Sequence, residues 1–277
     1  MANLSIAILS AVILLHPEVV LAQKGLEQIR LNSIGCRVRI DEGFINLEFP
    51  PFSDLSQIGT VKGIGAIRSV TARQCTSLDR FLREMLTVPS LRYIDLTNSD
   101  VANEFSAVTS LPAIEHLIIS DTKIEDFSFI GKLGELKKLN LSYTAFADSD
   151  IVHLAGLDQL TDLDLTYTEV SVSGCKKLSS LPSLRELSLI GAGFDESNYS
   201  LLRAFERPIR IRLAGARSFD GAPGECDLSV DNIRELGKAG ISILGAPTKS
   251  TDRICSVVIK DGDAKSTRLF TWNQLLS

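Results

Sequence analysis

The chain has 277 residues, of which 44% are apolar and 6% aromatic, and its formal net charge at pH 7 is −5. This length allows one or two domains with a large core. The mild acidity argues against a basic surface for nucleic acid. No apolar stretch reaches the roughly 18 residues of a transmembrane helix. We therefore expect a folded protein that binds no nucleic acid and has no integral membrane span in the mature chain.

The N-terminal segment has the features of a secretory signal. Leu4–Leu15 is a twelve-residue apolar stretch, and Val20 and Ala22 are small residues at the positions that signal peptidase prefers before a cut at Gln23. No Lys or Arg precedes the apolar stretch, so an amphipathic or core helix is the alternative. We predict a signal peptide over residues 1–22 and a secreted, periplasmic or cell-envelope location.

Residues 23–66 are predicted to form an N-terminal cap and a first degenerate coil. Two segments with alternating apolar residues, Cys36–Ile40 and Ile45–Phe49, flank the turn sequence Asp41-Glu42-Gly43. This pattern predicts a β-hairpin. A hairpin here would cover the apolar side of the coil that follows.

A nine-residue pattern, L-x-x-L-x-L-x-x-T, then recurs along the chain. Seven copies begin at residues 67, 91, 114, 136, 160, 184 and 208, at intervals of 22 to 24 residues. In the copy at residues 160–168, Leu163 and Leu165 alternate with polar residues, which predicts a short strand. Thr168 follows this strand, and its hydroxyl can bond a backbone group in the turn.

Between the copies, apolar residues return at helical spacing, as in Ile151, Leu154 and Leu157. One such unit cannot bury its own apolar side. Stacked units bring their strands together and share a continuous core, so at least three units are needed for stability. The leucines repeat because each coil must meet the next coil.

The ninth positions of the seven copies are Cys75, Ser99, Thr122, Thr144, Thr168, Ala192 and Ala216. Over residues 44–216 the pattern resembles the leucine-rich repeat family. It is more similar to the Thr-type repeats of bacterial members (L-x-L-S-x-T) than to the asparagine ladder of animal and plant members. The resemblance implies an α/β fold, a right-handed β/α horseshoe solenoid with parallel strands on its concave side and short helices on its convex side. Residues 67–216 are then the repeats.

Residues 217–277 are predicted to be the C-terminal capping region. Residues 231–239 have a helical pattern, residues 241–244 a strand pattern, and a β-hairpin is predicted around Asp261-Gly262. Such caps cover the apolar core of the last coil. A separate functional domain is the alternative.

Five cysteines are present, and Cys226 and Cys255 lie beyond the repeats. In an exported protein these two are the best candidates for a disulfide. Free thiols that pack as small hydrophobic residues are the alternative for this pair, and the favoured interpretation for the other three. No spacing of cysteines and histidines predicts a metal site.

Catalytic signatures are missing from the sequence. The three histidines, His16, His116 and His153, do not assemble with a nucleophile into a recognisable set. No P-loop or dinucleotide-binding pattern occurs in its required context. We therefore predict a protein that is not an enzyme and that uses no cofactor or metal.

The exposed positions of the predicted strands remain as the candidate site. Positions three, five and eight form stripes across the strands, with three tyrosines among them and charges that change sign along the stack. Aromatic side chains with a polar tip are favoured at protein interfaces. The alternative is that these are ordinary solvated strand residues. The predicted partner-binding residues are Tyr93, Asp95, His116, Lys138, Asn140, Tyr143, Asp162, Asp164, Tyr167, Glu186, Arg210 and Arg212.

The sequence thus predicts an exported, non-enzymatic leucine-rich repeat protein that recognises another protein through its concave sheet. Two other functions fit the same pattern. One is a structural, self-associating scaffold in the cell envelope. The other is an intracellular effector or adaptor that uses its repeats for substrate recognition.

Overall fold

The computed structural model describes residues 35–58, 66–101, 113–194, 197–213, 230–244, 256–258 and 268–270. The predicted signal peptide and the cysteines Cys226 and Cys255 lie outside these residues. The chain divides into two compact units, Met1–Leu133 and Gly134–Ser277.

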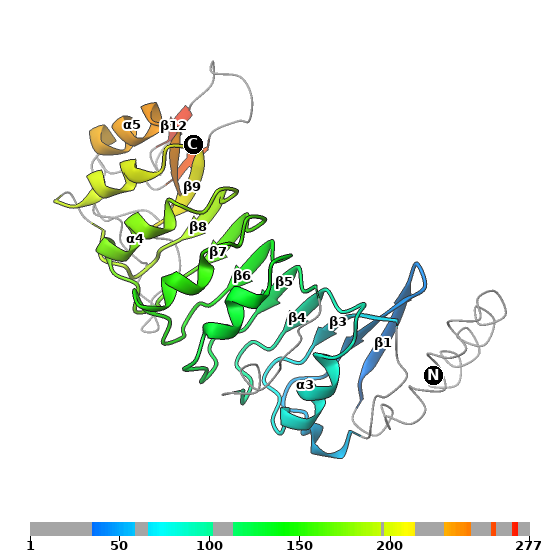
Figure 1. The fold of residues 1–277 in the computed structure, drawn as a ribbon. Helices are drawn as coiled ribbons and strands as arrows, with labels where there is room; N and C mark the ends of the chain where they lie inside the picture. The colour runs from blue at the N-terminus through cyan, green and yellow to red at the C-terminus, as the bar shows by residue number, and fades with distance from the viewer. Residues whose placement is uncertain are drawn as a thin grey trace. The chain divides into compact units, whose positions relative to one another are not determined.

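The first unit is built on strands β1 to β5 (Figure 1). They are β1 (Arg37–Asp41), β2 (Phe44–Glu48), β3 (Ile67–Thr71), β4 (Tyr93–Asp95) and β5 (His116–Ile118). Strands β1 and β2 are antiparallel, and β2 to β5 pair in parallel in chain order. Positive φ angles at Glu42 (49°) and Gly43 (82°) close the turn between β1 and β2, as two-residue hairpins require. The predicted N-terminal hairpin is confirmed.

The second unit continues the parallel pattern and ends in antiparallel strands. Strands β6 (Lys138–Asn140), β7 (Asp162–Asp164), β8 (Glu186–Ser188), β9 (Ile209–Arg212) and β10 (Ile241–Leu244) pair in parallel in chain order. Strand β11 (Ser256–Val258) is antiparallel to β10, and β12 (Arg268–Phe270) is antiparallel to β11. The predicted last strand and the antiparallel pair after it are confirmed, and the predicted turn at Asp261-Gly262 lies outside the described residues.

Short helices connect the strands and lie to one side of them in each unit (Figure 1). The first unit has η3 (Leu55–Gln57), α3 (Asp79–Met85) and η4 (Ser128–Lys132). The second has η5 (Asp150–Leu154), α4 (Val172–Leu178), η6 (Tyr199–Ala204) and α5 (Val230–Lys238). Several are 3₁₀ helices, a form used for short connections. None of the helices in the described residues is long and apolar enough to cross a membrane.

The repeated apolar positions form the core. The fourth position of each copy is at most 2% exposed, as shown by Val70, Ile94, Leu117, Leu139, Leu163, Leu187 and Ile211. The hydroxyls of Thr122, Thr144 and Thr168 donate to the carbonyl oxygens three residues earlier, at 2.7, 2.6 and 2.9 Å. They satisfy acceptors inside the turn, as the sequence predicted. Strand, turn and helical return recur along the described part of the chain, which confirms the α/β leucine-rich repeat fold.

Candidate binding face

The strand register places positions three and five of the repeats on the side of the sheet opposite the buried fourth position. We call this side the sheet face of each unit. In the first unit its two rows are Asn46, Ser69, Tyr93, His116 and Glu48, Thr71, Asp95, Ile118. In the second unit they are Lys138, Asp162, Glu186, Arg210 and Asn140, Asp164, Ser188, Arg212. The structure therefore brings ten of the twelve predicted binding residues together in two groups, one per unit, while Tyr143 and Tyr167 lie at position eight.

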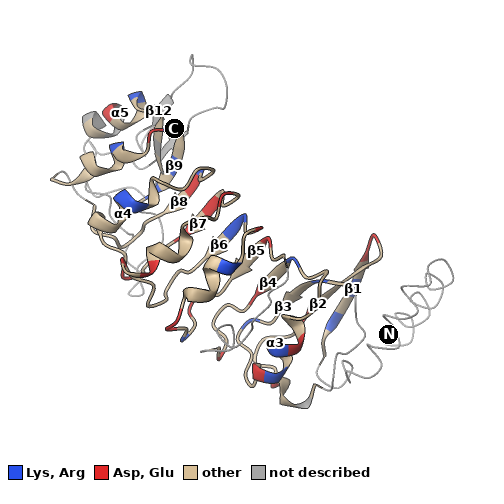
Figure 2. Cartoon of the chain, in the orientation of Figure 1, with Lys and Arg blue, Asp and Glu red and all other residues tan. Residues whose placement is uncertain are grey.

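In the second unit the charges at position three neutralise one another. Lys138 Nζ lies 3.3 Å from Asp162 Oδ1, and Arg210 Nη1 lies 3.2 Å from Glu186 Oε1. Strand β6 carries a basic segment, whereas β7 and β8 carry acidic segments (Figure 2). All four side chains keep contact with water, so each pair adds little to stability while fixing the charge pattern that a partner would meet.

Position five of the second unit serves the turn as well as the surface. Asn140 Oδ1 accepts hydrogen bonds from the backbone N–H and the hydroxyl of Ser142, at 2.9 and 2.7 Å. Asp164 Oδ1 accepts from the N–H of Thr166 at 2.9 Å. These are Asx turns, which end each strand at the same point. Both side chains are half-buried, so their capacity to contact a partner is reduced.

The burial of Asp95 differs from the expectation based on the sequence. Its side chain is only 1% exposed, so the prediction that it is part of an exposed stripe is wrong. Oδ2 accepts from Arg73 Nε at 2.7 Å and lies 2.6 Å from Arg73 Nη2, while Oδ1 accepts from the N–H and hydroxyl of Thr97 at 3.1 and 2.7 Å. The hydrogen bond from Arg73 to Asp95 raises the arginine's pKa further. Arg73, from the preceding coil, covers the carboxylate. Asp95 therefore holds Arg73 and the turn at Thr97 in place and does not itself face a partner.

Position eight has a left-handed backbone in each of its described copies, which the sequence analysis missed. The φ angles run from 50° to 91° at Gln74, Asn98, Asp121, Tyr143, Tyr167 and Gly191. Asparagine, aspartate and glycine adopt this conformation most readily, whereas it is unusual for a bulky residue. The Asn, Asp and Gly residues at this position were the signal that could have revealed it.

The two tyrosines at position eight form a contact pair on the second unit. The ring centroids of Tyr143 and Tyr167 are 5.1 Å apart with planes inclined by 37°, and Tyr143 is 44% exposed. A Cβ added to Gly191 would lie 2.8 Å from the Tyr167 ring. The ring of Tyr167 therefore lies on the glycine of the next coil, and the pair presents an aromatic surface at the end of the strands.

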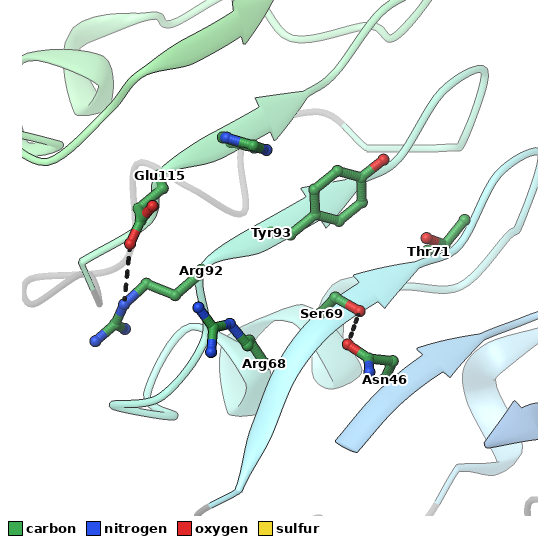
Figure 3. A pocket seen from close by; sticks show the side chains of 8 residues that line it. Asn46, Arg68, Ser69, Thr71, Arg92, Tyr93 and Glu115 are labelled. Atoms are coloured by element: carbon green, nitrogen blue, oxygen red, sulfur yellow. Dashed lines mark hydrogen bonds and ion pairs between the residues drawn. The ribbon is translucent and has the colours of Figure 1, made fainter. Parts of the chain in front are cut away.

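A pocket of about 400 Å³ opens on the sheet face of the first unit (Figure 3). Its lining residues come from β2 to β5 and the residues just before β4 and β5: they are Asn46, Arg68, Ser69, Thr71, Arg92, Tyr93, Glu115 and His116. Tyr93 and His116, both predicted, meet edge to face with centroids 6.0 Å apart. We call this cavity the Arg68 pocket. Arg68, Arg92 and Glu115 are its charged residues. None of them was among the predicted binding residues, because position two lies outside the alternation that defines the exposed stripes.

Within the described part of the chain, no group of His, Cys, Asp and Glu residues could hold a metal ion. Cys75 and Cys175 are free and buried. Burial raises the pKa of Cys75, and it raises the pKa of Cys175 to about 12. Both thiols therefore stay protonated at neutral pH and pack as small hydrophobic groups.

No protein-family model and no curated protein matches the chain. Among solved structures, it is similar to internalin C2 of Listeria monocytogenes, with 17% identity, coverage of 61% of this chain and 70% of that one, and a TM-score of 0.47. An internalin (inlF) of the same species has 12% identity, coverage of 78% and 70%, and a TM-score of 0.48. A leucine-rich repeat protein of Leptospira interrogans has 14% identity, coverage of 65% and 61%, and a TM-score of 0.40. At this level of identity the likeness concerns the fold alone.

Proposed function

We propose that this chain is a non-enzymatic recognition protein that binds another protein through its sheet face and the tyrosine pair at the ends of its strands. The tyrosine pair carries the proposal. Tyr143 and Tyr167 occupy left-handed positions, which costs on the order of 1 kcal/mol for each bulky residue. Asparagine or glycine would avoid this penalty, and other copies use them. Surface tyrosines held at such positions favour a binding role, because exposed aromatic rings with a polar tip are preferred interface anchors.

The charges of the sheet face support a protein partner. Both signs alternate within a few ångströms, as in the Lys138–Asp162 and Arg210–Glu186 pairs. A polyanion such as nucleic acid is bound by surfaces of one sign, whereas a mixed pattern selects a complementary protein surface and fixes its register.

Export belongs to the same proposal. It rests on the apolar stretch Leu4–Leu15 and on Val20 and Ala22 ahead of Gln23. The assignment of the repeats to the bacterial Thr-type is likewise proposed, on the residues at position nine. N-terminal sequencing of the mature chain tests export: Gln23 as the first residue supports it, and an N-terminus that retains the apolar stretch contradicts it.

Affinity capture from the source cell's envelope and medium tests recognition. One bait carries the native residues 23–277, and a second carries Tyr93→Ala, Tyr143→Asn and Tyr167→Asn with unchanged thermal unfolding. A control bait carries Val152→Ala, at a residue that is 65% exposed on helix η5, away from the sheet.

A partner held by the native and control baits and lost from the tyrosine variant supports the proposal. A partner held equally by all three baits contradicts it, because its binding surface then lies elsewhere. If the bait captures only further copies of itself, sedimentation at increasing concentration would show the self-associating scaffold instead.

A further inference from the structure

We propose that the Arg68 pocket seats an acidic side chain, aspartate or glutamate, of the partner protein. This inference rests on the proposed function and names the chemistry of one of its contacts. It follows from the hydrogen-bonding groups that the pocket presents, their charges, and the partners that they already have within the chain.

Arg68 supplies the positive charge. Its guanidinium lies over the ring of Phe44, with 4.9 Å between Cζ and the ring centroid, and this cation–π contact orients the side chain. Within the described residues Arg68 has no carboxylate partner: Asp41, which lies opposite Phe44 in the hairpin, makes no ion pair with it. The stacked guanidinium keeps its edge donors available, in the fork geometry that matches a carboxylate.

The second arginine of the pocket is already engaged. Arg92 Nη1 donates to the carbonyl oxygens of Pro89 and Leu91 at 2.7 and 3.0 Å, and its Nε lies 3.7 Å from Glu115 Oε1. Figure 3 shows this pair on one side of the pocket. Arg92 and Glu115 cancel in charge, so the pocket as a whole carries one net positive charge from Arg68. This matches a single carboxylate better than a doubly charged phosphate.

The neighbouring polar groups add further donors. Asn46 Oδ1 accepts the hydroxyl of Ser69 at 2.6 Å (Figure 3), which leaves the Nδ2 donors of Asn46 without a partner among the described residues. The Thr71 hydroxyl likewise has no side-chain hydrogen bond in the described part of the chain. None of these groups is a buried orphan, so water satisfies them until a ligand with acceptor oxygens replaces it. A carboxylate with two oxygens can accept from Arg68 and from one of these groups.

The shape of the pocket suits a side chain delivered by a protein. Its volume of about 400 Å³ exceeds what one carboxylate fills, and Tyr93 and His116 provide ring surfaces for the methylene stem of the residue. The pocket opens on the sheet face, in line with the rows of positions three and five. An extended segment of a partner could therefore place its acidic residue here while its neighbours contact those rows.

A peptide selection tests this proposal while the partner itself is still unidentified. A displayed library of random peptides is selected on the native chain, and the best binder is synthesised in two forms, with its acidic residue and with the corresponding amide. Both are titrated against the native chain, Arg68→Gln, Arg68→Lys and Arg185→Gln. Arg185 is the matched control, an exposed arginine at the same repeat position in the second unit, outside the predicted binding residues and without an ion pair within the described residues.

We expect Arg68→Gln to weaken the acidic peptide about tenfold to a hundredfold, the effect of losing a hydrogen bond to a charged group. Arg68→Lys should retain part of the affinity, because it keeps the charge and loses the fork. The amide peptide should bind the native chain as weakly as the acidic peptide binds Arg68→Gln. Arg185→Gln should leave the affinity unchanged.

Two results overturn the inference and are distinguishable. Peptides that depend on Tyr143 and Tyr167 but bind equally to native chain and Arg68→Gln reject the acidic contact and leave the proposed function standing. A selection that yields no peptide sensitive to substitution of Arg68, Tyr93, Tyr143 or Tyr167 rejects both.

Discussion

The two units have cores of the same kind and differ on their exposed faces. In both, the fourth position of the repeat is buried and the strands keep one register. On the first unit, Arg73 covers the buried carboxylate of Asp95, and Arg68, which has no ion pair within the described residues, lines a pocket. On the second, Lys138 and Arg210 are matched by acids on adjacent strands, and two tyrosines contact each other in the turns. Stacking of the coils requires apolar residues at the inward positions. The outward positions have no such requirement, so their charges and aromatic residues can differ between the units.

The largest effects should be equal in the two units, because they concern the shared core. Leu117→Ala in the first unit and Leu163→Ala in the second each remove a side chain that is at most 2% exposed. Each should lower the free energy of unfolding by about 3 kcal/mol through lost burial and the cavity left behind. Urea unfolding measures both. If one substitution costs far less than the other, the equivalence of the two cores is wrong.

The next largest effect on stability should come from the Arg73–Asp95 pair, which has no equivalent among the described residues of the second unit. Arg73→Met leaves a carboxylate that is 1% exposed without its charged partner, which should cost about 2 kcal/mol. Asp95→Asn makes the position resemble Asn140 of the second unit and should cost less, since the amide oxygen can still accept from Thr97. The double variant should be more stable than Arg73→Met alone. A double variant that is the least stable of the three would contradict the idea that buried charge is the cause.

Exchanging residues at position eight tests the backbone strain. Asn98→Tyr in the first unit places an aromatic residue at φ 52° and should destabilise by about 1 kcal/mol. Tyr143→Asn relieves the strain and loses the ring contact, which is worth about 0.5–1.5 kcal/mol, so its net effect should be close to zero. Thermal unfolding of both variants measures this. Large destabilisation by Tyr143→Asn would show that the tyrosine is structural, and the argument for a binding role would fail.

The smallest effect is expected from the exposed ion pairs. Lys138→Gln breaks the ion pair with Asp162. The side chains of Lys138 and Asp162 are 54% and 31% exposed, so the substitution should lower the free energy of unfolding by about 0.5 kcal/mol or less. The difference from the native chain should disappear at about 1 M salt, where charges are screened over about 3 Å. A loss that persists at high salt would show that Lys138 contributes by packing.

The sequence was sufficient for the fold because the repeat places each leucine in register with the next. The sequence pattern directly predicts the strands, the N-terminal hairpin, the helix Val230–Lys238 and the hydrogen bonds of the Thr122 and Thr144 hydroxyls. Positions three and five could be placed on one face because strands alternate.

The site was only partly predictable, because burial on the exposed face depends on contacts between coils. Asp95 looks like a solvated strand residue until Arg73 of the preceding coil is placed over it. The strain at Tyr143 depends on a φ angle that the asparagines and glycines at the same position could have suggested. Arg68 lies at position two, outside the alternation that defines the face, so its place in a pocket required the structure.

Site-specific photo-crosslinking tests the central claim most directly. A photoreactive phenylalanine analogue is placed in turn at Tyr93, Tyr143 and, as the control on helix η5, Val152, and the chain is irradiated in the source cell. Recognition through the sheet face predicts that the two tyrosine positions crosslink to one common protein and that Val152 does not. Crosslinking of that protein from Val152, with none from Tyr93 or Tyr143, would contradict it.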